Sequence, residues 1–465
     1  MVKKEHSKFG FKDQFGYVFG DLAGSMVNLY IDTYILTFST YVLGISAAWM
    51  AGLFLFAKIW DAINDPLIGS LPDRFTIGKS GNKFKPYIKI AMFPLAFSVL
   101  MCFADVSSWP SAMKHLWIAV GYILYGMSYT GTSMPYGAMA SVITKDPIER
   151  TKLSRARSIG GTAVGVLFLP LVPMLIWNED QSANPSGFFT LAVIACISSI
   201  IFYIVLLNCT TERYKEVPEK TQEKKSDYKF FEVLKEAIKN RPLIGVMVAT
   251  LGSCIASASM GSMSMYLYRE YYHAPKLMAL TSPLSIPVLL ICFPLIPKLA
   301  QKFGKRKVIL FSAAYNLVFS LCLFFFPIAN PYVYLILSTL ANIGQTGFMM
   351  LIWAFVTECI DYQEYKTNKR ADGTLYSIYT FSRKIGSSLT HSGATYLLAA
   401  IGYVSGAQVQ AAAVGEGIRG IVTLLPALAS LVEIIGIGVI YNLSKEKTEK
   451  IYAELRARNE LETTE

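Results

Sequence analysis

The sequence predicts an all-α membrane protein with twelve transmembrane helices, and two observations lead to this prediction. Hydrophobic residues make up 53% of the 465 residues and charged residues only 16%, whereas about a quarter of the residues in a soluble protein are charged. Apolar runs of the ~20 residues that a helix needs to cross a bilayer recur along nearly the whole chain. The apolar surface must therefore face lipid, and no room is left for a sizeable soluble domain.

The spans fall into two sets of six, separated by a polar segment. The first set lies near residues 15–42, 46–70, 87–104, 115–142, 157–177 and 187–209. The second lies near 243–268, 277–300, 308–328, 331–360, 374–401 and 417–442. The expected organisation is a cytoplasmic N-terminus (1–14), an N-terminal six-helix bundle (15–209), a cytoplasmic linker (210–242), a C-terminal six-helix bundle (243–442) and a cytoplasmic tail (443–465).

The basic residues orient these spans. If the N-terminus lies inside, 36 of the 43 Lys and Arg residues fall in inside segments, and only Lys114, Arg269, Lys276 and Arg419 fall in outside loops. The positive-inside rule then predicts a multi-pass protein of the cell (inner) membrane with both termini in the cytoplasm. The net charge of +11 is therefore interpreted as favouring contact with a membrane surface, and no nucleic-acid partner is expected.

Several kinds of chemistry are not expected. The seven cysteines lie within or at the ends of apolar runs and form no CxxC pair, so disulfides and zinc sites are not predicted. The chain contains no HExxH, GxSxG or Walker A motif, so it is not predicted to be an enzyme, and no cofactor is expected.

A repeated loop points to duplication. The run Gly69-Ser-Leu-Pro-Asp73-Arg74, followed by Gly78, lies after the second span, and Lys302-Phe-Gly304-Lys305-Arg306 lies after the eighth. Gly78 and Gly304 are about half the chain apart, as a six-plus-six duplication requires. The first loop resembles the signature of the major facilitator superfamily. That resemblance implies the major facilitator fold, in which two six-helix halves are related by pseudo-symmetry.

Charged residues inside the spans are the candidates for function, because an ionised side chain at mid-bilayer costs on the order of 2.5 to 3.5 kcal/mol on insertion scales. They are Asp21, Asp32, Lys58, Asp61, Asp65, Glu358, Arg383, Lys384 and Glu433. At ~3.6 residues per turn, Asp61, Asn64 and Asp65 share one helix face. Two carboxylates this close favour a bound proton or a small hard cation with oxygen ligands. Structural salt bridges to Lys58 and another base are the alternative.

Residues 57–66, AKIWDAINDP, closely resemble the signature of the glycoside-pentoside-hexuronide:cation symporters, the family of melibiose permease. The resemblance continues over nearly the full chain, and its motifs together are highly specific. It includes Gly20-Asp21, Tyr129-Thr130, Pro135, Glu149-Arg150, Arg157, the run Asp361-Tyr-Gln-Glu364-Tyr-Lys366 and the run Tyr376-Ser-Ile-Tyr-Thr-Phe-Ser-Arg383-Lys384-Ile-Gly386.

The resemblance implies two sites. A cation site for Na⁺ or H⁺ maps onto Asp61, Asn64, Asp65 and Thr130. A sugar site, or its coupling to the cation, maps onto Asp21, Tyr129, Arg157 and Lys384, with Ser133 and Tyr379 as further substrate contacts. Carboxylate, guanidinium and ammonium groups suit vicinal hydroxyls. Trp353 either stacks on a pyranose ring or serves in packing or against lipid.

This chain departs from melibiose permease at three positions. Gly20 stands in place of a Lys before the first Asp. Ser133 stands in place of a second Asp in span four, and Gly137 stands in place of an aromatic residue that follows it. We therefore expect a pocket that is less charged and roomier beside span four, which argues against a galactoside. On the cytoplasmic side, Arg150 and Arg370 are expected to pair with Glu358, Asp361 and Glu364 as an inner gate; surface ion pairing is the alternative.

The function expected from these sites is cation-coupled secondary active uptake of a sugar or glycoside by alternating access, in a chain that works as a monomer in the lipid bilayer. A transporter of another, lipid-like amphiphile on the same scaffold is the alternative. It would need an apolar lateral opening, whereas Asp21, Tyr129, Arg157 and Lys384 predict a polar cavity.

Overall fold

The computed structural model describes residues 9–69, 71–75, 77, 81–144, 146–213, 239–367, 372–407 and 409–462. Within these residues the protein is helical, and the one extended pairing is an isolated bridge between Trp177 and Ala183. The chain divides into two compact units. The N-terminal unit comprises Met1–Gln222, Pro275–Pro283 and Tyr403–Gln410, and the C-terminal unit comprises Glu223–Ala274, Leu284–Gly402 and Ala411–Glu465. The prediction of an all-α protein is confirmed.

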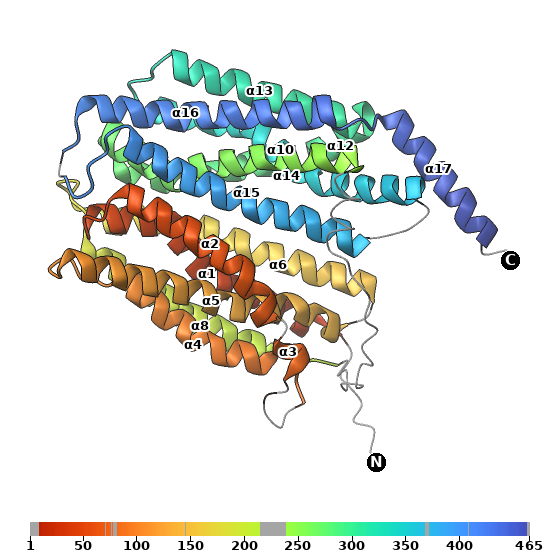
Figure 1. Ribbon diagram of the computed structural model, residues 1–465, viewed down its shortest axis with the longest axis horizontal. Coiled ribbons are helices and arrows are strands. Elements are labelled where there is room, and N and C mark those ends of the chain that lie inside the picture. Colours follow the sequence, from red (N-terminus) through yellow and green to blue (C-terminus); the bar gives the residue numbers. More distant parts are fainter. Residues whose placement is uncertain are drawn as a thin grey trace. The chain divides into compact units, whose positions relative to one another are not determined.

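The N-terminal unit is a bundle of long helices (Figure 1). They are α1 (Phe11–Tyr41), α2 (Ala47–Gly69), α4 (Lys85–Cys102), α5 (Ser111–Ile143), α6 (Pro147–Leu167) and α8 (Pro185–Cys209), with the short α3 (Leu71–Arg74) and α7 (Val172–Ile176) between them. Helix α1 packs against α6 and α8, α4 packs against α5 and α8, and α2 packs against α5. Helices α1, α2, α5 and α6 carry the predicted site residues of this unit.

The C-terminal unit is a second bundle (Figure 1). It contains α10 (Arg241–Ala258), α12 (Thr281–Phe303), α13 (Lys305–Phe325), α14 (Pro331–Thr367), α15 (Asp372–Ala400) and α16 (Ala412–Ile434). After α10 the chain kinks at Gly261 and then forms α11 (Ser264–Tyr266) and a π-helical turn that ends at Tyr271. Helix α16 continues as a π-helix over Ile435–Ile440. Helix α16 lies between α10 and α13 and packs against both.

The long helices coincide with the twelve expected spans. One further helix, α17 (Lys445–Glu462), lies in the segment that the sequence assigns to the tail. Lys447 places its ammonium 5.8 Å from the centre of the Tyr362 ring on α14. Burial, together with the carboxylates of Glu358 and Asp361, raises the pKa of Tyr452 on α17 above its ordinary value. The tail is therefore packed on α14 rather than extended.

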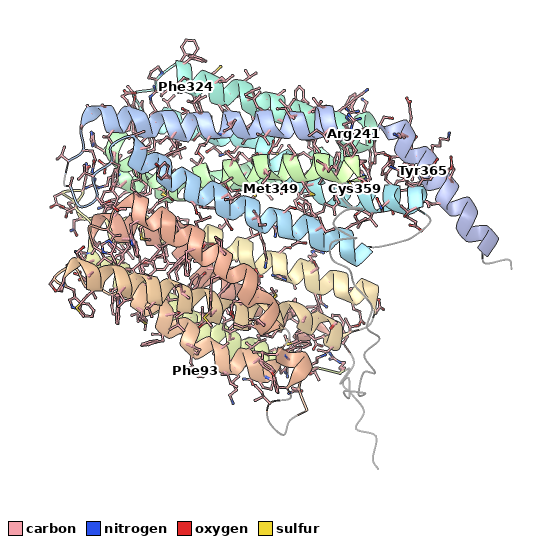
Figure 2. The ribbon with its side chains drawn as sticks, in the orientation of Figure 1. Phe93, Arg241, Phe324, Met349, Cys359 and Tyr365 are labelled. Carbon is pink, nitrogen blue, oxygen red and sulfur yellow. The ribbon has the colours of Figure 1, made fainter. Side chains whose placement is uncertain are left out.

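Eight helices in the described part are long and apolar enough to cross a membrane by length and composition: α4, α6 with α7, α8, α10, α12, α13, α14 and α16. Their outward side chains include exposed apolar residues such as Phe93 on α4, labelled in Figure 2, and Phe311 on α13. The four long helices outside this set are α1, α2, α5 and α15. These four helices carry most of the residues predicted to bind substrate and cation.

Both units hold their helix ends with buried or partly buried polar groups. The carboxylate of Glu212, which is 3% exposed, accepts hydrogen bonds from the backbone N–H groups of Lys83, Phe84 and Lys85 at 2.5, 3.1 and 2.9 Å. Lys83 and Phe84 directly precede α4 and Lys85 is its first residue, so the carboxylate lies at the helix N-terminus, where N–H groups lack internal acceptors and negative charge is favoured. Glu212 therefore caps α4, although it follows the last helix of its unit.

The start of α1 is fixed by a second pair. Arg213 donates two parallel hydrogen bonds to the carboxylate of Asp13, at 2.7 and 3.1 Å. The backbone N–H of Thr211 donates to the same carboxylate at 3.1 Å. Because both charged groups are nearly buried, this bidentate pair is a strong one. The first residues of the predicted linker, 210–213, are thus part of the bundle, and residues 214–238 of that linker lie outside the described part.

The far end of α16 is held by two arginines of the C-terminal unit. Arg306 of α13 donates to the carbonyl oxygens of Ile437 and Gly438 at 3.1 and 2.7 Å. Arg241 of α10 donates to those of Ile440 and Val439 at 3.1 and 3.2 Å, and Figure 2 shows it beside this end of α16. Guanidinium groups stabilise the carbonyl groups left unpaired at a helix C-terminus.

Candidate functional site

Two of the substrate residues predicted in the N-terminal unit, Asp21 of α1 and Arg157 of α6, are in direct contact. Arg157 of α6 donates from Nε to Oδ1 of Asp21 at 3.2 Å, and Ser25 donates to Oδ2 at 3.4 Å. The Asp21 side chain is 17% exposed and that of Arg157 is 50% exposed. Half of the Arg157 side-chain surface is therefore exposed, while the Asp21 carboxylate is largely buried and held by two hydrogen bonds. The sequence named both residues but not their ion pair.

Helix α6 can approach Asp21 this closely because it presents two glycines. A methyl group on Gly161 would lie 2.8 Å from Oδ2 of Asp21. One on Gly160 would lie 2.6 Å from the carbonyl oxygen of Val18 in α1. Real Cβ atoms do not approach other atoms this closely, so both positions favour glycine. Sequence reasoning missed these residues, and the only signal for them was an adjacent glycine pair in a polar span.

Steric contact explains why position 20 is glycine in this chain rather than the lysine of melibiose permease. A Cβ at this position would lie 2.3 Å from Cε2 of Tyr136 on α5. Tyr136 and Tyr17 exchange hydrogen bonds, each hydroxyl donating to the other residue's carbonyl oxygen at 2.7 and 3.0 Å. The guanidinium of Arg157 lies 5.4 Å from the Tyr136 ring centre. An aromatic ring thus occupies the space where a lysine side chain would begin, and it supports Arg157.

The other predicted substrate residues of this unit follow along α5. Tyr129 stacks on Tyr125, with ring centres 5.9 Å apart and planes inclined by 25°, and its ring lies 3.7 Å from the Cβ position of Gly24. Ser133 is half-buried one turn further along. A Cβ on Gly137 would lie 3.7 Å from the guanidinium of Arg157. Gly137, which replaces an aromatic residue of melibiose permease, therefore lies beside Arg157, and no side chain from this position fills the space next to the guanidinium.

A polar chain that the sequence did not predict lies on the same face of α1. The Tyr125 hydroxyl donates to the Asn28 side chain at 2.8 Å, and the Asn28 amide donates to Asp32 at 2.9 Å. Residues 21, 25, 28 and 32 repeat at spacings of three and four, which places them on one stripe. Asp32 lies well inside α1, which continues to Tyr41, so it does not end a helix.

The predicted cation residues meet between α2 and α5. Thr130 donates its hydroxyl to Oδ1 of Asp65 at 2.7 Å. One turn earlier on both helices, Oδ1 of Asp61 lies 2.9 Å from the Cβ position of Gly126. The other oxygen of Asp61 lies 3.5 Å from the ammonium of Lys58. Both the expected cation site and its salt-bridge alternative therefore have a geometric basis, and Gly126 gives Asp61 its room.

Asn64 completes this group. It is 5% exposed, and its amide nitrogen has no hydrogen-bond partner among the described residues. Oxygen and nitrogen of an amide exchange places by a simple rotation, so an oxygen ligand can occupy this buried position at no steric cost. Among the described residues, no three or more His, Cys, Asp or Glu side chains are placed so that they could hold a metal ion together. The predicted ligands are two carboxylates, an amide and a hydroxyl, which are oxygen donors of the kind that hard cations prefer over soft transition metals.

The C-terminal unit offers a different surface. Trp353 of α14 meets Tyr379 of α15 edge to face, with ring centres 5.5 Å apart, and the Arg383 guanidinium lies 5.8 Å from the Trp353 ring centre. Tyr379 is 1% exposed and accepts from Thr250 at 3.4 Å, whereas Trp353 is 42% exposed. Lys384 is exposed on α15. Of these two rings, Trp353 therefore has an exposed face and the buried Tyr379 packs against it.

The predicted gate is described only in part. Glu358 of α14 is buried and accepts from the ammonium of Lys305 at 2.6 Å and from the hydroxyl of Tyr441 at 2.5 Å. Asp361 and Glu364 are half-buried on the same helix. The side chain of Arg150 and all of Arg370 lie outside the described residues, as do the side chains of Asp73 and Arg74. The inner gate stays a prediction.

An apolar hollow between α10, α15 and α16 contains none of these residues. It is lined by Ile255, Thr390, Gly393, Ala394, Tyr396, Leu397, Leu425 and Leu428. Its lining offers hydrocarbon rather than hydrogen-bonding groups, which does not suit a sugar.

Comparison with known proteins identifies the family. Residues 16–445 match the model of the family described as MFS/sugar transport protein. The uncharacterized symporter YjmB of Bacillus subtilis is 30% identical over 97% of this chain and 96% of its own. The isoprimeverose transporter of Lactiplantibacillus pentosus is 30% identical over 84% and 81%. The glucuronide carrier protein homolog of Escherichia coli is 25% identical over 96% of both chains.

Solved structures agree on the fold. A D-xylose–proton symporter aligns over 90% of this chain and 96% of its own, with a TM-score of 0.63 and 14% identity. A bacterial homologue of the human lysosomal transporter Spinster aligns over 93% and 98%, with a TM-score of 0.65 and 13% identity. At these identities the likeness shows the major facilitator fold alone, and it confirms the fold expected from the repeated loop. The chain belongs to the MFS/sugar transport protein family and, as its resemblance to the glycoside-pentoside-hexuronide:cation symporters predicted, is a membrane transporter rather than an enzyme.

Proposed function

We propose that this protein imports a sugar or glycoside together with a monovalent cation, across a cell membrane in which both of its termini are cytoplasmic. The family supports the substrate class, and so do relatives named for isoprimeverose and glucuronide. The observation that carries cation coupling is the oxygen cluster of α2 and α5. There, Thr130 binds Asp65 at 2.7 Å, one turn from Asp61 and beside the buried amide of Asn64.

We assign sugar binding to two kinds of group. Charged side chains bind the sugar hydroxyls, and an aromatic ring stacks on the apolar face of the sugar. In the N-terminal unit the Asp21 carboxylate accepts hydrogen bonds and the half-exposed Arg157 guanidinium donates them. In the C-terminal unit the exposed face of Trp353, backed by Tyr379, suits the apolar face of a pyranose. Arg383 adds positive charge near that ring, which favours an acidic glycoside over a neutral one.

Sodium is the coupling ion that fits this donor set. A proton needs one carboxylate of suitable pKa, whereas sodium needs several oxygens at once. Asn64 and Thr130 supply neutral oxygens beside the two aspartates. Sodium coupling therefore predicts a role for Asn64 that proton coupling does not.

The experiment is uptake and counterflow with a panel of labelled neutral glycosides, hexuronides and one lipid-like amphiphile, with and without a sodium gradient. We expect sugars to be transported and sodium to stimulate accumulation. Asn64→Ala should lose the sodium stimulation and keep any proton-driven uptake, and Asn178→Ala, an exposed loop amide, serves as the control. Full sodium stimulation in Asn64→Ala would make proton symport the better reading, and transport of only the amphiphile would overturn the sugar assignment.

A further inference from the structure

One buried acid of the C-terminal unit has no role in the sites described above. Glu433 lies on α16, is 1% exposed, and neither of its carboxyl oxygens has a hydrogen-bond partner among the described residues. A carboxylate buried in a membrane bundle without a partner is strongly unfavourable, whereas a carboxylic acid in the same place is not. Such a residue therefore needs either a neutral form or a bound cation.

Glu433 is buried because α10 and α16 approach each other closely. A Cβ on Gly252 of α10 would lie 2.9 Å from Cγ of Glu433 and 2.5 Å from the carbonyl oxygen of Ala429. A Cβ on Gly436 would lie 2.6 Å from the backbone nitrogen of Ala249 and from the carbonyl oxygen of Gly245. Small residues at 245, 249 and 252 of α10 thus form the seam against α16, as is common between membrane helices.

The polar neighbour of Glu433 is Gln345 of α14, whose side chain faces the carboxyl group. Gln345 is 7% exposed and donates its amide to Ser253 of α10 at 3.0 Å. Its own oxygen, Oε1, is buried and has no donor among the described residues. The two carboxyl oxygens of Glu433 and Oε1 of Gln345 each lack a hydrogen-bond partner within 3.5 Å among the described residues, and Gln345 is the one side chain whose interaction reaches the carboxyl group. A single proton on the carboxyl group would supply the donor that these oxygens lack.

No ion pair in the described part includes Glu433. Six basic residues on α16 and on the elements packed against it have other contacts. Arg241 of α10 and Arg306 of α13 bind carbonyl oxygens of Ile437–Ile440. Arg269 pairs with Glu270 after α10, Lys305 pairs with Glu358 of α14, and Arg419 pairs with Glu416 of α16. Arg383 of α15 lies over the Trp353 ring. The nearest titratable group on the facing helix, Cys254, contacts the carbonyl oxygen of Arg383. The carboxyl group therefore has no described cation that would favour its ionised form.

We propose that Glu433 is a proton-binding site of the C-terminal unit, separate from the cation site on α2 and α5, and that its carboxyl O–H donates a hydrogen bond to Oε1 of Gln345. A sodium ion fits less well, because it would need five or six oxygens and only three acceptors are open. The proton sits in the α10–α14–α16 seam, directly before the π-helical segment Ile435–Ile440. Such irregular segments are frequent at functional sites in membrane helices.

The proposal is tested by infrared spectroscopy of the purified protein at neutral pH. We expect a carbonyl stretch of a protonated carboxylic acid in the wild type that Glu433→Gln removes and that Glu416→Gln, an exposed acid of the same helix, leaves in place. Gln345→Leu should shift this band, because it removes the acceptor. A spectrum that is unchanged by Glu433→Gln would show that the residue is ionised and would overturn the proposal.

Thermal unfolding across pH gives a second readout that needs no transport activity. A native state that holds a proton released on unfolding loses stability as pH rises. The wild type should therefore lose stability with rising pH more steeply than Glu433→Gln, by about one proton per chain. The amide of glutamine also donates to Gln345, so this variant should stay folded. If the two slopes agree, the proposal fails, and sodium coupling on α2 and α5 is unaffected by that result.

Discussion

Replacing Gly161 with alanine should weaken sugar binding without unfolding the protein. The added methyl group would lie 2.8 Å from Oδ2 of Asp21 and 3.5 Å from Oγ of Ser25. The carboxylate is the end of a flexible side chain, so it can rotate away at small cost to the fold. It would then leave the position in which it meets Nε of Arg157 at 3.2 Å.

The expected loss of affinity is that of one hydrogen bond between a sugar hydroxyl and the displaced Asp21 carboxylate. A hydrogen bond to a charged group contributes about 1.5 to 3 kcal/mol. Because the Arg157 side chain is 50% exposed, solvent screening reduces this to about 1 to 2 kcal/mol, which corresponds to a loss of roughly 5- to 30-fold in affinity for the sugar. Alanine in place of a helical glycine adds about 0.5 to 1 kcal/mol of helix stability, so the fold should tolerate the change.

The assay is equilibrium binding of a labelled glycoside in de-energised membrane vesicles, with thermal unfolding as a check on folding. Gly165→Ala on the same helix is the matched control, since nothing lies within 4 Å of its Cβ position. We expect Gly165→Ala to bind as the wild type does. Equal affinity in both variants would mean that the Asp21 carboxylate does not contact the sugar in the position seen here.

Three further outcomes are expected. Asp61→Asn or Asp65→Asn should abolish cation-driven accumulation in a protein that still reaches the membrane, and unchanged sodium stimulation would exclude the assigned site. Thr130→Val should lower the apparent affinity for sodium roughly tenfold, because it removes the donor to Asp65, whereas Thr130→Ser should not; the comparison fails if both behave alike. Glu212→Ala should lower the stability by about 2 to 4 kcal/mol, because it leaves the N–H groups at the start of α4 without an acceptor. Thermal unfolding measures this loss, and a change below about 0.5 kcal/mol would contradict the role of Glu212 as a cap.

The local parts of this structure could be predicted because they depend on helix period alone. Apolar length fixed the position of the long helices, and the spacing of Asp61, Asn64 and Asp65 placed them on one face. The resemblance to a known family added Thr130, which indeed bonds to Asp65. The helix α17 was missed, since a charged segment reads as a tail until an aromatic partner such as Tyr362 is known.

Contacts between distant helices could not be predicted in the same way. Asp21 and Arg157 were each named, but their ion pair joins residues 136 positions apart. Gly161 and Gly126 matter only because a carboxylate of another helix lies against them, and an isolated glycine in a sequence carries no such information. Glu212 was assigned to a solvated linker by its composition, whereas its partners on α4 show that it is buried.

The bonds of Thr210–Arg213 determine where this transporter can be divided into two polypeptides. A first fragment that ended with α8 at Cys209 would lack the carboxylate at the start of α4 and the guanidinium that holds Asp13. It would also lack the carbonyl group of Thr210 that receives the ammonium of Lys85 at 2.5 Å. A first fragment that ended just beyond Arg213 would keep all three. Co-expressed halves should therefore assemble when the break follows Arg213 and not when it precedes Thr210.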